Sequence, residues 1–342
     1  MTGVLLAIVS AIAFGITTPV IAWAGRDLGP LTTAALLYAG AALAALAMRV
    51  GARPSGGRLR RADAPRVLAI AIAGAAIAPT CLAWGLSRAG ATAGSLALNL
   101  EAVFTVVLAW LVHREPLGRR VVVAVGLMAA GGAALALDAT GRSATGLLGA
   151  IVVAGATLGW AVDNTLTRPL ADRDPLQVIV AKGALGALVT GTIAIARGEP
   201  MPESWQITAL IGCGATGYGL SLRLYLLAQR RVGAARTGSV FALAPFVGAA
   251  IAWSTGDRSA GPWTAAAAAC FALGVYLHVS ESHHHHHVHE PADHEHAHRH
   301  DDGHHDHAHD PPVAGEHTHR HRHDRMVHEH DHAPDIHHEH TH

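Results

Sequence analysis

The chain has 342 residues, of which 51% are hydrophobic and 15% charged, and its formal net charge at pH 7 is +0. Residues 1–280 contain too few polar side chains to cover a water-soluble surface, whereas the last sixty residues hold 25 of the 27 histidines. The composition therefore excludes a single soluble domain and predicts a membrane-embedded body followed by a polar, histidine-rich tail.

Stretches of about 18 or more apolar residues are typical of membrane-spanning helices. The chain contains ten, at residues 4–24, 31–50, 67–86, 91–112, 121–137, 147–167, 176–196, 207–228, 234–254 and 263–279. No basic segment precedes the first, which indicates an uncleaved first helix rather than a removed signal peptide. Cys81, Cys213 and Cys270 all lie inside spans, so we interpret them as small apolar residues and expect no disulfide.

The arginines outside the spans or at their ends indicate the orientation in the membrane. The four loops after spans two, four, six and eight hold thirteen of them, and the five intervening loops hold five. Because positively charged loops face the cytoplasm, both termini are predicted to be cytoplasmic, in a multi-pass protein of the plasma (inner) membrane.

An internal repeat occurs at an ungapped offset of 143 residues, which corresponds to five spans. It pairs Arg88 with Arg231 and Trp110 with Trp253. An odd number of crossings inverts the second copy, and inverted repeats hold a substrate site at their interface near mid-bilayer. The fold class predicted is all-α, with ten helices in two inverted five-helix halves. The expected divisions are residues 1–140, residues 141–280 and a disordered tail at 281–342.

Distinctive segments occur in both halves, at residues 89–91 leading into 100–104, residues 114–117, and residues 233–235 leading into 243–246, with further ones at 163–168, 182–183, 217–219 and 236–238. Together these segments resemble the EamA-type branch of the drug/metabolite transporter superfamily. The resemblance covers residues 1–280 and implies a ten-helix transporter, with a kink at Pro245 in span nine. Ala102 stands where the family usually has proline.

Glu101 is the eleventh residue of a 22-residue span and so lies near the bilayer midplane. A carboxylate at this depth is costly and usually faces a cavity or a partner. We interpret Glu101 as a candidate carrier of a proton or cation. The alternative is a neutral glutamic acid that bonds a neighbouring backbone group or Asn99.

A second group of polar residues lies nearer the predicted cytoplasmic face. Asp163 and Asn164 precede the inner end of span six, and Lys182 lies at a similar depth in span seven, so an ion pair between the two helices is expected. It either holds the helices together or serves as a gate or substrate-carboxylate site. Arg223 and Arg236 approach the same depth, with snorkelling to the interface as the alternative. Trp160 shares a face with Asp163 and is expected in the cavity.

The tail repeats the pattern His-x-His. In an extended chain, residues two apart lie on one face, so successive imidazoles can bind one ion. Neutral imidazole suits Zn, Cu, Ni and Co, so a divalent metal is expected on the tail, although no cofactor is required. The candidate ligands are His294, His296, His298, His300, His305, His307, His309, His317, His319, His321 and His323.

These patterns predict a secondary transporter that moves a small metabolite or drug-like solute by alternating access, with proton coupling through Glu101. One alternative is a carrier of a divalent metal (Ni, Co or Zn), and another is a membrane-anchored metal buffer. Within residues 1–280 neither a Gly-x-Ser-x-Gly nor a His-Glu-x-x-His motif occurs, so an enzyme is not expected. The expected partners are the lipid bilayer, a small-molecule or ion substrate and a second copy in a homodimer, with no nucleic acid.

Overall fold

A computed structural model describes residues 2–50, 56–114, 117–141, 143–170, 173–258, 260–279, 283–289, 292–298, 317–323 and 326–332. For the last four ranges only the course of the backbone is described. Glu115 and Pro116, which contribute to the family resemblance, lie outside the described residues.

The first half of the body is helical throughout its five spans. Its elements are α1 (Gly3–Gly15), α2 (Thr17–Ala24), α3 (Pro30–Arg49), η1 (Arg61–Asp63), α4 (Ala64–Ile70), η2 (Ala71–Ile77), α5 (Ala78–Ala89), α6 (Ala91–Ala97), α7 (Leu100–His113) and α8 (Arg119–Thr140). Spans one and four each consist of two helices, and span three contains the π-helix η2.

The second half repeats this organisation. Its elements are α9 (Ala144–Thr167), η3 (Arg168–Leu170), α10 (Pro175–Ala196), α11 (Ser204–Cys213), η4 (Gly214–Leu220), α12 (Ser221–Val232), α13 (Ala234–Phe241), α14 (Ala244–Ser254) and α15 (Pro262–Val279). Polar side chains begin several of these helices: Ser143 accepts a hydrogen bond from the Gly146 N–H at 3.0 Å, and Asp174 accepts one from the Leu176 N–H at 3.0 Å.

Nine helical segments among the described residues are long and apolar enough to cross a membrane. They match nine of the ten expected spans, including the fifth and tenth. The eighth expected span, 207–228, is also helical, over the consecutive elements α11, η4 and α12 of 10, 7 and 12 residues. Its glycines and Arg223 lower its hydropathy, which separates it from the other nine.

The 143-residue repeat is visible in the backbone. The π-helices η2 (Ala71–Ile77) and η4 (Gly214–Leu220) begin and end 143 residues apart. The helix that follows each ends at a glycine with nearly identical dihedrals, φ 86° and ψ 160° at Gly90 and φ 83° and ψ 162° at Gly233. Residues that have a Cβ atom rarely adopt this backbone conformation, so glycine is required at both turns.

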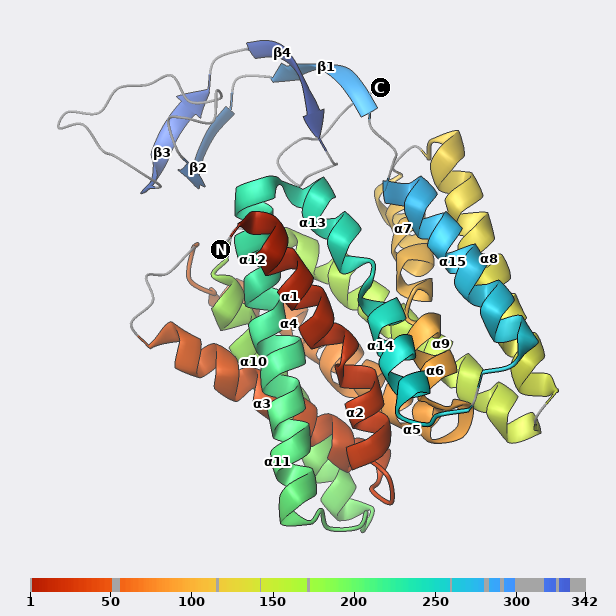
Figure 1. Cartoon of the computed structure of the whole chain (residues 1–342). Coiled ribbons are helices and arrows are strands. Elements are labelled where there is room, and N and C mark those ends of the chain that lie inside the picture. The colour runs from red at the N-terminus through yellow and green to blue at the C-terminus, as the bar shows by residue number, and fades with distance from the viewer. Residues whose placement is uncertain are drawn as a thin grey trace.

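Helices of the first half pack against helices of the second half. The most extensive contacts join α3 with α10, α8 with α15 and α5 with α9, and Leu37, Leu82, Met128 and Phe271 are fully buried between them. Figure 1 places the start of α1 and the end of α15 at the same end of the bundle. We call this the proximal end, and the opposite one the distal end.

The tail contains four short strands within its described residues: β1 (His283–His289), β2 (Ala292–His298), β3 (His317–His323) and β4 (Met326–His332). They form two antiparallel ribbons, β1 with β4 and β2 with β3. From the sequence we expect a disordered tail, whereas its described residues form these short strands. The alternating His-x-His pattern suits an extended chain. A two-stranded ribbon is only marginally stable by itself. That the tail has no hydrophobic core of its own stays a prediction.

The glycine turns allow a direct test of the repeat. Gly233→Ala keeps φ at +83° with no steric contact within 4 Å of the added Cβ, so its cost is backbone strain alone, about 1–3 kcal/mol. We expect a lower midpoint in thermal unfolding of the detergent-solubilised protein. Gly126→Ala, in α8 with equally open space, serves as the control and should leave the midpoint unchanged or raise it. Equal unfolding midpoints for the two variants would contradict the conclusion that the turn at Gly233 requires glycine.

Candidate functional site

Span four is broken between α6 and α7. Around the break the backbone makes tighter bonds to the third preceding residue, including Leu98 N to Ser95 O at 3.2 Å and Glu101 N to Leu98 O at 3.0 Å. The side-chain amide of buried Asn99 also donates to Leu96 O at 2.9 Å. Such local bonds replace helical ones, so span four bends without the proline that Ala102 replaces. Span nine breaks correspondingly before Ala244, next to Pro245.

Glu101 lies in the first turn of α7, directly after this break. Its Oε1 accepts a hydrogen bond of 2.8 Å from Asn164 Nδ2 of α9. The amino-terminal end of a half-helix carries partial positive charge, which favours a carboxylate there. Asp163 and Lys182 are close enough to interact with Glu101 electrostatically. The structure thus brings together four of the residues predicted from sequence.

Asp163 and Lys182 form the predicted ion pair. Lys182 Nζ lies 2.6 Å from Asp163 Oδ2, and the side chains are 18% and 4% exposed. Thr167 Oγ1 donates to the other carboxylate oxygen at 3.1 Å. A Cβ on Gly74 of η2 would overlap the Asp163 carboxylate, so glycine at this position makes room for the acid. Asn164 is exposed and Glu101 half-buried. The Glu101–Asn164 pair is therefore the more exposed side of the cluster and the ion pair its more buried side.

The carbonyl of Gly74 is freed by the π-helix. The Ala78 N–H, which would serve it in an α-helix, donates to Ala73 O instead, and residue 79 is proline, which has no N–H. Two side chains from other helices donate hydrogen bonds to the Gly74 carbonyl oxygen instead: Tyr38 OH at 2.5 Å and Trp160 Nε1 at 3.0 Å. Trp160 is buried on the face of α9 that it shares with Asp163, and its place in a substrate cavity stays a prediction.

Aromatic rings of both halves adjoin the cluster. Tyr218 of η4 lies 5.5 Å from the Tyr38 ring and 6.4 Å from the Trp160 ring. Phe14 of α1 meets Tyr218 edge-on at 5.8 Å and lies 5.3 Å from Phe241 of α13. Charged groups and aromatic faces thus border one another at the interface of the two halves.

Arg223 and Arg236 do not join this cluster. Arg223 is half-buried and Arg236 exposed, and neither makes an ion pair or hydrogen bond with a described residue of the cluster. Sequence reasoning missed Tyr38, Gly74 and Tyr218. The available signal was Pro79, which removes an N–H in mid-span and so predicts a carbonyl in need of a partner.

Contacts between the halves close the distal end. Glu199, between α10 and α11, accepts hydrogen bonds of 2.8 Å from both N and Oγ1 of Thr32 at the start of α3. Gln206 Nε2 donates to Ala24 O at 3.3 Å and to Arg26 O at 3.2 Å. These bonds join the α2–α3 turn to the α10–α11 turn.

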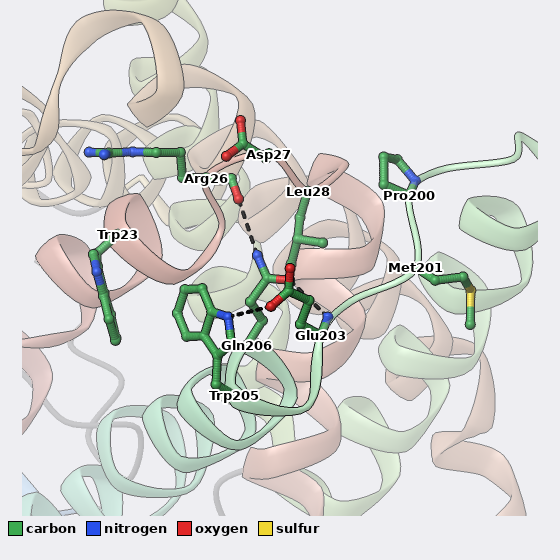
Figure 2. Close-up of a pocket in the computed structure, with 9 residues that line it drawn as sticks. All are labelled: Trp23, Arg26, Asp27, Leu28, Pro200, Met201, Glu203, Trp205 and Gln206. Atoms are coloured by element: carbon green, nitrogen blue, oxygen red, sulfur yellow. Dashed lines mark hydrogen bonds between the residues drawn. The ribbon is translucent and has the colours of Figure 1, made fainter.

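An open cavity of about 440 Å³ lies beside these distal contacts (Figure 2). The Trp23 and Trp205 rings line it with centroids 4.9 Å apart, and Trp205 Nε1 donates to Glu203 Oε2 at 2.9 Å. None of the site residues predicted from sequence lines this cavity.

A second set of contacts closes the proximal end. Arg173 binds both carboxylate oxygens of Asp63, at 2.8 Å and 3.3 Å. Asp174 lies 3.7 Å from Arg49 Nε, and its N–H donates to Gly57 O at 2.8 Å. The loop between spans two and three is therefore bonded to the loop between spans six and seven, which mirrors the distal arrangement.

Among the described residues of the helical body, no group of three His, Cys, Asp or Glu side chains could hold a metal ion. Of the predicted tail ligands, His300, His305, His307 and His309 lie outside the described residues. The remaining seven lie on two strands, with His294, His296 and His298 on β2 and His317, His319, His321 and His323 on β3.

Two inverted helical halves, with broken helices and charged groups meeting between them inside the bilayer, define a membrane transport protein. The chain belongs to the EamA-like transporter family, which it matches over residues 1–137 and 147–280. The family is one of transporters rather than enzymes.

One relative is an uncharacterized transporter of Methanothermobacter thermautotrophicus, 28% identical over 202 residues, or 57% of this chain and 59% of the relative. The chain thus matches less than two thirds of that relative's length. A crystal structure described only as that of a protein is 18% identical, with a TM-score of 0.59, and the match covers 81% of this chain and 95% of that chain. That likeness supports the fold alone.

The ion pair predicts coupled effects on stability. Asp163→Asn leaves Lys182 without its partner in a low-dielectric site, which should cost about 3–5 kcal/mol. Adding Lys182→Met removes the unpaired charge, so the double variant should recover much of this loss. Chemical unfolding of the detergent-solubilised proteins measures both effects as a double-mutant cycle. Losses that simply add would show that the two side chains do not interact.

Proposed function

We propose that this membrane transporter is a secondary carrier that moves a small solute by alternating access between its two halves. The observation that carries the proposal is the cluster of Glu101, Asn164, Asp163 and Lys182 beside Tyr38. It combines residues of both halves at a helix break, where inverted-repeat carriers bind their substrates. A small metabolite or drug-like solute with both polar and apolar parts matches these groups and the adjoining rings.

The contacts at the two ends of the bundle support alternating access to the site. Glu199 and Gln206 join the halves distally, while the Asp63–Arg173 and Arg49–Asp174 pairs join them proximally. Opening the site to either side requires one set to break while the other persists. Because each set consists of a few hydrogen bonds and partly solvated ion pairs, its rupture is within reach of solute binding energy.

Proton coupling is proposed to occur at Glu101. Its carboxylate has an accessible amide partner, Asn164, and lies near a second acid and a lysine. Protonation of Glu101 would remove a charge from the site and change its balance with Lys182. Solute binding and proton binding then influence each other through one cluster.

We place the protein in the plasma membrane with both termini in the cytoplasm, on the strength of the loop charges. The two ends of the helical body lie on one side of the bundle, which agrees with this placement (Figure 1). The histidine-rich tail is proposed to bind Zn, Ni, Co or Cu there. A homodimer stays a prediction.

A divalent metal as the transported substrate is the second candidate, favoured by the tail alone. The helical body argues against it, because its described residues hold no group of three metal-binding side chains. A membrane-anchored buffer is the third. It leaves the paired helix breaks and the buried ion pair without a role.

Replacing Glu101 tests the coupling. Glu101→Gln retains an oxygen that can accept from Asn164 but cannot exchange a proton. In proteoliposomes loaded with the pH indicator pyranine, a panel of amino acids, carboxylic acids and amines is added externally. We expect solutes that shift internal pH with the wild type to give no shift with Glu101→Gln.

The matched control is Glu203→Gln, an acid at the distal end whose carboxylate accepts from Trp205. It should retain the wild-type pH response. A response of Glu101→Gln equal to that of wild type would remove the carboxylate from the coupling mechanism.

Deleting residues 281–342 separates carrier from buffer. We expect the truncated protein to keep solute flux in proteoliposomes and to lose binding of Zn²⁺ and Ni²⁺, measured by equilibrium dialysis. Cells that produce either form should then differ in metal tolerance but not in solute uptake or export. Loss of solute flux on truncation would contradict an independent carrier body, and unchanged metal binding would contradict a metal-binding tail.

A further inference from the structure

The two ribbons of the tail bring distant histidines opposite one another. Each ribbon contains three directly opposed histidine pairs. They are His283–His332, His285–His330 and His287–His328 in the β1–β4 ribbon, and His294–His321, His296–His319 and His298–His317 in the β2–β3 ribbon.

In each ribbon these pairs occupy alternate positions and therefore share one face. The intervening positions of the β2–β3 ribbon pair Asp293 with Arg322 and Glu295 with Arg320, which are opposite charges. A shift of one residue would place His294 opposite Arg322 and lose both the histidine ladder and the charge pairs. This register therefore places histidine opposite histidine at alternate positions of both ribbons.

The spacing of a histidine ladder suits a metal ion. Opposed residues of an antiparallel pair have Cα atoms about 4.5–5.5 Å apart, and residues two apart on one strand are separated by about 6.8 Å. Two adjacent pairs therefore bring four histidine positions together on one face of the ribbon. Four nitrogen ligands satisfy the tetrahedral preference of Zn²⁺, and imidazole also suits Ni²⁺, Co²⁺ and Cu²⁺.

We propose that each ribbon is a divalent-metal site whose ligands come from both of its strands. The ion then links residues 283–298 to residues 317–332, rather than binding neighbouring histidines of one His-x-His segment. A two-stranded ribbon is marginal by itself, so an ion that binds only the paired form stabilises the pairing. The inference rests on the proposed metal binding of the tail and adds that binding folds it.

Non-additive loss of bound ions tests the cross-strand ligands. Three sets of histidines with identical His-x-His-x-His spacing are replaced by asparagine in the full-length, nanodisc-embedded protein, and bound Zn²⁺ is counted after equilibrium dialysis. The β2 set is His294, His296 and His298, the β3 set is His317, His319 and His321, and the control set is His305, His307 and His309.

We expect the β2 set and the β3 set to lose the same number of ions, and the two combined to lose no more than either alone. The β2 set combined with the control set should lose the sum of the separate losses. Additive losses for the β2 and β3 sets would overturn cross-strand binding while leaving a metal-binding tail intact.

A distance measurement tests the pairing itself. Ala297 and Thr318 are opposed in the β2–β3 register. They are changed to cysteine in a variant whose three native cysteines are alanine, and both are spin-labelled. Zn²⁺ should produce strong dipolar broadening that EDTA reverses, whereas labels at Ala297→Cys and Ala314→Cys, which are closer in sequence, should show less.

An absence of zinc-dependent approach between positions 297 and 318 would overturn the proposal. If neither the wild type nor any variant binds Zn²⁺, the metal role of the tail fails with it. Solute transport by the helical body is tested separately by the pyranine assay, so that proposal would be unaffected by this outcome.

Discussion

Within a bilayer there is no water to satisfy a backbone group that leaves the helical pattern, so each such group needs a partner inside the protein. This constraint organises the centre of the molecule. The π-register of η2 and the missing N–H of Pro79 free the Gly74 carbonyl, and Tyr38 and Trp160 occupy it. Those two side chains are held in place as a result, at the border of the charged cluster.

The repeat supplies matching scaffolds, but the two halves carry different side chains. Their π-helices coincide at an offset of 143 residues, and both fourth helices break in mid-membrane. Glu101 has Ala244 as its counterpart and Trp160 has Thr17. Symmetry of the backbone therefore allows the halves to exchange conformations, whereas the side chains differ between them: Glu101 comes from the first half, and Asp163 and Lys182 come from the second.

Hydropathy and spacing were sufficient to predict the helical spans, the repeat and the Asp163–Lys182 pair, because helices have a fixed rise and their faces follow from position. The same reasoning could not find the Glu101–Asn164 bond, which depends on how α7 and α9 pack. Nor could it find the break at Asn99, because the side chain competes with the backbone in a way that composition does not reveal. Pro79 was the overlooked signal, since its effect appears on Gly74, five residues earlier.

The end of α15 at Val279 and the start of β1 at His283 are separated by three residues. Three residues reach at most about 14 Å even when fully extended. Whatever ligand the first strand of the tail binds is consequently confined to the neighbourhood of the proximal helix ends. A tether this short corresponds to an effective concentration in the millimolar range, so a ligand held by β1 would be presented at that concentration to a second binding group at the proximal helix ends.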